Sequence, residues 1–95
     1  MDKMEAYREK LQAQLKEWKT KIEMLEEKAA RSTGETKAEM LRSIEELRQK
    51  KEVVKEKWNA LQKEGGVVWD KMIEGVDAAV SELKSALDRI ISRFK

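Results

Sequence analysis

The sequence is 95 residues long, which suits one small domain. Charged residues make up 42% of it, hydrophobic residues 40% and aromatic residues only 5%, a composition typical of long helices and coiled coils. The formal net charge is +2, with acidic and basic residues alternating along most of the chain. This alternation indicates solvated helix faces, and it does not favour nucleic acid as a partner.

Several kinds of chemistry are excluded by residue types that the sequence lacks. It has no histidine, the commonest general base, and no cysteine for a thiolate nucleophile or a thiolate metal site. The pair Gly65-Gly66 lacks the spacing of a phosphate-binding loop. We therefore expect no enzyme activity, no catalytic residue, no cofactor and no metal. No apolar run approaches the roughly 18 residues of a membrane span, and the charged N-terminus argues against a secretory signal, so we expect a cytoplasmic protein.

The first predicted helix covers about residues 3–31. Its apolar residues recur every seven positions in two interleaved rows, which predicts the narrow seam of a coiled coil. The two rows are Met4, Leu11, Trp18 and Leu25, and Leu15, Ile22 and Ala29. On the polar side, Glu17 and Lys21 are spaced for an ion pair within the helix.

The second predicted helix covers about residues 36–63 and repeats this pattern. Its rows are Met40, Leu47, Val54 and Leu61, and Ile44 and Trp58. Lys51 occupies a seam position, where a lysine extends its charged end toward solvent or helps to specify register.

The two seams are out of phase, because Leu25 and Met40 are fifteen positions apart where two heptads need fourteen. Between them, Gly34 suits the end of a helix, and the segment from Thr36 to Glu39 has the form of a capping box. These features predict a tight turn and a helical hairpin. The alternative is one continuous helix over residues 1–63 with a skip residue, followed by a C-terminal helix, in a chain that oligomerises.

The third predicted helix covers about residues 67–94, after a break at Gly65-Gly66. It has three apolar positions in each heptad, so its apolar face is broader than a coiled-coil seam. We regard this face as the candidate interaction surface. Its residues are Trp69, Ile73, Val76, Val80, Leu83, Leu87, Ile90 and Phe94.

Together these segments predict an all-α fold, an antiparallel coiled-coil-like three-helix bundle forming a single domain over residues 1–95. Trp18 and Trp58 lie in the seams and are expected in the core. Trp69 and Phe94, at opposite ends of the third helix, also suit a helix that lies on a lipid surface.

Over most of its length, the sequence resembles a group of short bacterial coiled-coil proteins, which includes cyanobacterial stress-responsive members. The resemblance is carried by Leu15, Trp18, Ile22, Leu25, Lys28-Ala29, Ile44-Glu45-Glu46-Leu47-Arg48, Trp69-Asp70, Gly75-Val76-Asp77, Leu83-Lys84-Ser85-Ala86 and Ser92-Arg93-Phe94-Lys95. It implies a cytoplasmic helical protein without a known activity or catalytic residues. A weaker likeness is to apolipoprotein-type amphipathic helices.

The sequence therefore favours a non-enzymatic structural or interaction protein, self-associating and stress-linked. Its expected partner is a second copy of itself or another helical protein. The alternative is peripheral binding to a lipid or membrane surface through residues 67–94. The basic segment Arg48-Gln49-Lys50-Lys51 is flanked by glutamates, so we expect a solvated face there rather than contacts with nucleic acid.

Overall fold

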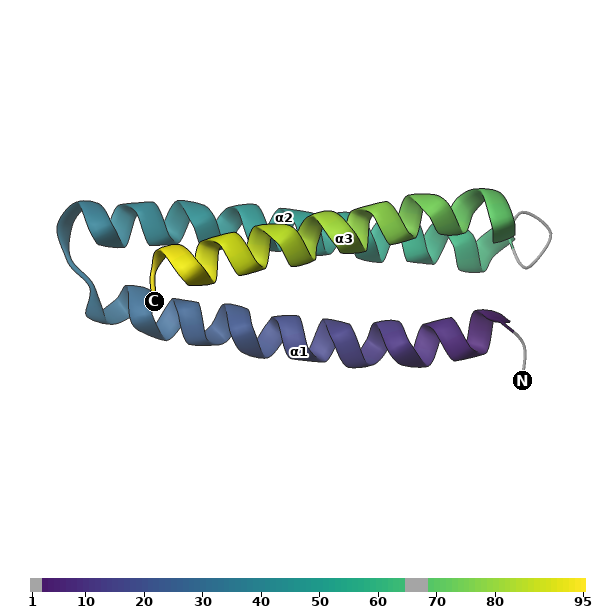
Figure 1. The fold of residues 1–95 in the computed structure, drawn as a ribbon, viewed down its shortest axis with the longest axis horizontal. Coiled ribbons are helices and arrows are strands. Elements are labelled where there is room, and N and C mark those ends of the chain that lie inside the picture. The colour runs from purple at the N-terminus through teal and green to yellow at the C-terminus, as the bar shows by residue number, and fades with distance from the viewer. Residues whose placement is uncertain (1–2, 65–68) are drawn as a thin grey trace. The chain divides into compact units, whose positions relative to one another are not determined.

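A computed structural model describes residues 3–64 and 69–95 of the chain. Within these residues it has three helices and no strand: α1 (Lys3–Arg31), α2 (Gly34–Glu64) and α3 (Trp69–Arg93) (Figure 1). α1 packs against α2, and α2 packs against α3. The predicted all-α three-helix bundle is therefore confirmed.

The chain divides into two compact units, residues 1–44 and residues 45–95, and α2 runs through both. The first unit consists of α1 and the start of α2. The second consists of the rest of α2 together with α3. Each unit is thus a pair of helical segments whose apolar rows can cover one another.

In the first unit, the continuous helix over residues 1–63 is not formed. α1 ends at Arg31, as predicted, and only Ser32 and Thr33 lie between it and α2. Gly34 has a φ angle of 60°, the left-handed conformation that glycine adopts without steric cost. A helix cannot run through such a residue, so the chain turns here and the hairpin prediction holds.

α2 begins at Gly34, two positions earlier than predicted. The amide of Lys37 donates to the carbonyl of Thr33 at 3.4 Å, which starts the helical hydrogen-bond pattern. Thr36 consequently lies inside α2, and the prediction that it caps the helix is wrong. The chain reverses at Gly34 itself, so the residues that resembled a capping box lie inside α2 and not before it.

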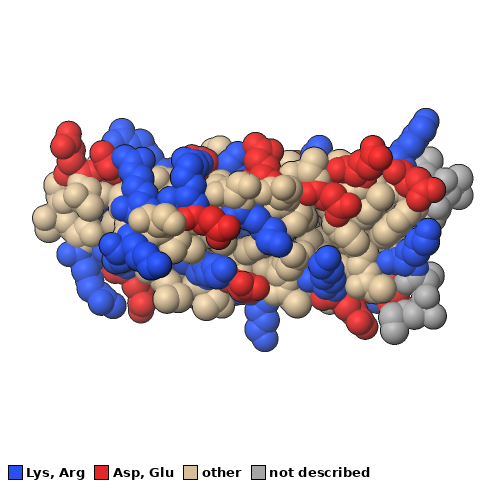
Figure 2. All heavy atoms as spheres, in the orientation of Figure 1, with Lys and Arg blue, Asp and Glu red and all other residues tan. Residues whose placement is uncertain are grey.

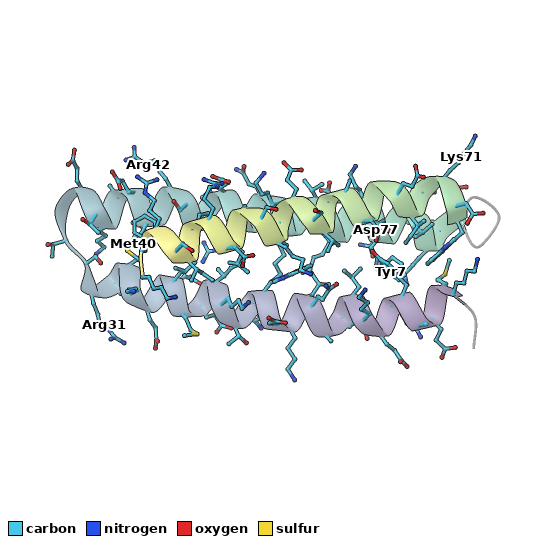
Figure 3. The ribbon with its side chains drawn as sticks, in the orientation of Figure 1. Tyr7, Arg31, Met40, Arg42, Lys71 and Asp77 are labelled. Carbon is cyan, nitrogen blue, oxygen red and sulfur yellow. The ribbon has the colours of Figure 1, made fainter. Side chains whose placement is uncertain are left out.

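Most seam residues of the first unit are buried, as the heptad rows predict. Met40, 2% exposed, lies on the side of α2 that faces α1, while Arg42 and Arg31 point away (Figure 3). Met4 and Leu15 are only half-buried. The buried residues of this unit are Leu11, Trp18, Ile22, Leu25, Ala29, Met40 and Ile44.

The second unit buries most of the seam of α2 and the central apolar residues of α3. Fully burying a leucine or valine stabilises a fold by roughly 1.5–3 kcal/mol, so this set is the main source of stability of the unit. Lys51 is half-buried. The buried residues are Leu47, Val54, Trp58, Leu61, Val76, Ala79, Val80, Leu83, Ala86, Leu87 and Ile90.

The predicted break at Gly65-Gly66, and the predicted first residues of the third helix, 67 and 68, lie outside the described residues. α3 is described from Trp69 and ends at Arg93, one residue before the predicted end. Lysine, arginine, aspartate and glutamate side chains are interspersed over the face shown in Figure 2, in keeping with the alternation of charge along the sequence.

Candidate interaction surface

The broad apolar face of α3 lies mainly inside the second unit. Its central residues are covered by the chain itself, whereas its ends are partly open to solvent. The buried members are Val76, Val80, Leu83, Leu87 and Ile90. The half-buried members are Trp69 and Ile73 near the start of α3 and Phe94 just after its end. That this face binds another molecule stays a prediction.

An aromatic contact holds the start of α3 against α2. The rings of Trp58 and Trp69 meet edge to face, with centroids 6.5 Å apart and planes at 85°. This is the geometry in which the positive edge of one ring meets the negative face of the other, and it contributes about 0.5–1.5 kcal/mol beyond burial. Periodicity alone placed both tryptophans on apolar faces, and the structure shows that they contact each other.

Two ion pairs join α2 to α3 farther along the helix pair. Lys50 Nζ is 2.9 Å from Glu82 Oε1, and Arg89 Nη2 is 2.7 Å from Glu46 Oε2. The earlier residue of α2 pairs with the later residue of α3, as two antiparallel helices require. These four residues lie on polar faces of the sequence, and their partners were not predicted.

The ion pair with Lys50 changes the acidity of Glu82. The hydrogen bond from Lys50 is the largest cause that lowers the pKa of the Glu82 carboxyl, and the positive charge of Lys50 lowers it further. Partial desolvation opposes this, and the charge of Lys57 adds to the lowering. Glu82 is therefore ionised at neutral pH and keeps its pair with Lys50.

The ion pairs border a groove of about 220 Å³ between α2 and α3. Val53, which is 41% exposed, and the small residue Ala79 form its apolar part. The lining residues are Glu46, Gln49, Lys50, Val53, Ala79 and Glu82. The groove therefore has an apolar centre and a charged rim.

Among its described residues, the first unit exposes two large apolar side chains, Met24 at 64% and Leu41 at 51%. Met24 lies in a shallow, open hollow on α1 that also contains Glu23, Glu26 and Glu27. Neither Met24 nor Leu41 belongs to a heptad row. Single exposed apolar residues are common on helical surfaces, so they define no site by themselves.

The described part of the chain has no cluster of three or more carboxylate, histidine or cysteine residues that could hold a metal ion. No buried side chain in residues 3–64 and 69–95 is polar or charged. Among the described helices, none is long and apolar enough to cross a membrane. No known protein family, curated protein or solved structure gives a significant match to this chain. The geometry defines a small all-α protein with apolar seams and charged outer faces.

Proposed function

We propose that this protein is a non-enzymatic interaction protein that associates through its helices with a second copy of itself or with another helical protein. The observation that carries the proposal is the separation of apolar from charged residues in the described part of the chain. All buried side chains of the described residues are apolar and follow the helical rows, while the charged residues occupy the other faces, with the half-buried seam residue Lys51 as an exception. Apolar stripes of this kind pair with equivalent stripes on other helices, and they do so between chains as well as within one.

The dimensions of the groove support a helical partner over a small-molecule ligand. At about 220 Å³ it is smaller than the roughly 300–1,000 Å³ of typical ligand pockets. It offers no buried polar side chain that could orient a small molecule. The resemblance to short bacterial coiled-coil proteins supports a cytoplasmic, stress-linked setting for this role.

Co-purification of two copies with different tags, co-expressed in one cell, tests the proposal. We expect each tag to capture the other copy, and the yield to fall when untagged chain is added as a competitor. The other kind of partner is tested by purifying the singly tagged chain from a lysate and identifying any helical protein that co-purifies with it. If neither a second copy nor another protein is captured, the proposal is contradicted.

The alternative function, peripheral lipid binding through α3, is favoured by the breadth of its apolar face. It requires α3 to leave α2, which breaks the ion pairs of Glu82 and Arg89 and the contact between Trp58 and Trp69. Co-sedimentation with neutral and anionic vesicles, followed by tryptophan fluorescence, separates the two functions. A blue shift and co-sedimentation support lipid binding, and an unchanged spectrum with both vesicle types contradicts it.

A further inference from the structure

The connection between α1 and α2 is short and locally held. Only Ser32 and Thr33 separate two helices of 29 and 31 residues. The next residue, Gly34, is the only one in the described ranges with a positive φ angle. A single left-handed residue beside a two-residue linker therefore determines that α1 folds back on α2.

Few hydrogen bonds hold this turn. The amide of Ser32 donates to the carbonyl of Ala29 at 3.1 Å, and its hydroxyl donates to the carbonyl of Lys28 at 2.9 Å. The carbonyl of Thr33 accepts from the amide of Lys37 at 3.4 Å. These three bonds are local, and a straight helix would replace the backbone ones with its own i to i+4 pattern. The Ser32 hydroxyl also lies 3.5 Å from Met40 Sδ on α2, and a straight helix would break this contact.

No strong helix breaker other than Gly34 lies in this part of the sequence. The chain contains no proline. A Cβ atom placed on Gly34 would meet no other atom within 4 Å, so the turn does not depend on close packing around the glycine. The hairpin and the straight helix thus differ mainly in the backbone of residues 32–34.

We propose that residues 32–34 are a hinge through which α1 exchanges between two copies of this chain. In the exchanged dimer, α1 and α2 of each copy form one helix, and each α1 packs on the α2 of the other copy. A second copy is the fitting partner because it presents the same seam residues, Met40 and Ile44, that α1 meets at the start of its own α2. The inference rests on the proposed self-association and specifies how it occurs.

The substitution Gly34→Ala tests the hinge. Alanine is strained at a φ of 60° but is a better helix former than glycine, so both effects favour the straight form. Because each dimer contains two hinges, we expect the dissociation constant of the dimer to fall by about 100-fold or more. Gly75→Ala is the matched control. It makes the same change within α3, where the added methyl meets only Lys57 Nζ at 3.8 Å, and we expect no change in dimerisation.

The geometry of the dimer is tested by a distance within one chain. Spin labels are attached at Lys19→Cys and Arg42→Cys in the same chain. They react at these two positions only, because the chain has no cysteine of its own. Diluting the labelled chain with unlabelled chain leaves only the distance within one copy. A continuous helix places the two backbone positions about 35 Å apart, whereas the hairpin places them within about 20 Å. We expect the longer distance to appear in the dimer and to dominate in Gly34→Ala.

The outcomes separate the hinge from self-association in general. One outcome is a dimer that keeps the short distance, is unaffected by Gly34→Ala and is lost in Val53→Glu. Such a dimer uses the groove between α2 and α3, which overturns the exchange but retains self-association. A chain that stays monomeric both as wild type and as Gly34→Ala overturns both. A dimer strengthened by Gly34→Ala, with the long distance and no effect of Val53→Glu, supports the exchange.

Discussion

The sharpest test of the fold compares one substitution at two positions of α2. Leu47 is 0% exposed and Leu41 is 51% exposed, although they are only six residues apart on the same helix. Replacing either residue with alanine changes helix propensity equally, so the difference between the two variants reports burial alone. We expect Leu47→Ala to lower the free energy of unfolding by about 2.7–5 kcal/mol, the cost of lost apolar contact and of the cavity left behind. Leu41→Ala is expected to cost less than about 1 kcal/mol, because half of that side chain already contacts water.

Urea denaturation followed by circular dichroism measures both effects. Small domains unfold with about 5–15 kcal/mol, so Leu47→Ala removes a large share of the total. At about 4–8 °C per kcal/mol, it should lower the melting temperature by at least about 10 °C. If Leu47→Ala does not fold, Val54→Ala, also 0% exposed, should cost about 2 kcal/mol. Equal losses from Leu47→Ala and Leu41→Ala would refute the assignment of the buried face of α2.

Two further variants test the contacts of the second unit. Glu82→Gln should destabilise the protein at neutral pH, because the folded pKa of Glu82 is lowered by Lys50. The stabilisation that the substitution removes is fully present above the ordinary glutamate pKa and is lost as pH falls through the folded pKa. Urea midpoints measured against pH should therefore converge for the variant and the wild type in acid. A difference in midpoint that does not vary with pH would contradict this. Gly75→Ala should raise the free energy of unfolding by about 0.5–1 kcal/mol, because alanine is the better helix former. The added methyl group meets only Lys57 Nζ at an ordinary contact distance. A loss of stability in the same denaturation assay would contradict the open space beside Gly75.

Periodicity predicted most of the core because burial on a helix repeats with the helical turn. Val54, Leu61 and Leu83 lie on the predicted rows and are fully buried. Met24 and Leu41 fall off the rows and are exposed. The pair Glu17 and Lys21 was also predicted, and their side chains are 3.0 Å apart, because spacing within one helix fixes which residues meet.

Contacts between helices could not be predicted in the same way. The pair of Lys50 and Glu82 joins residues 32 positions apart, and that of Arg89 and Glu46 joins residues 43 apart. Which residues meet depends on how far α2 is shifted along α3, and a heptad repeat fits equally well after a shift of seven residues. The groove at Val53 depends on the same register.

The turn shows a different limit of sequence reasoning. Gly34 marked the site of the break, since the left-handed conformation favours glycine. The start of α2 was placed too late because the segment from Thr36 to Glu39 also matches a capping box. A glycine two residues before such a segment can itself occupy the first helical position, and local sequence patterns do not distinguish the two arrangements.

The central claim is that this protein associates through its helices, and sedimentation equilibrium of the unmodified chain tests it most directly. The chain has a mass of 11.1 kDa. We predict that the measured mass rises with concentration from this value toward that of a dimer. A mass of 11.1 kDa at every concentration would contradict self-association.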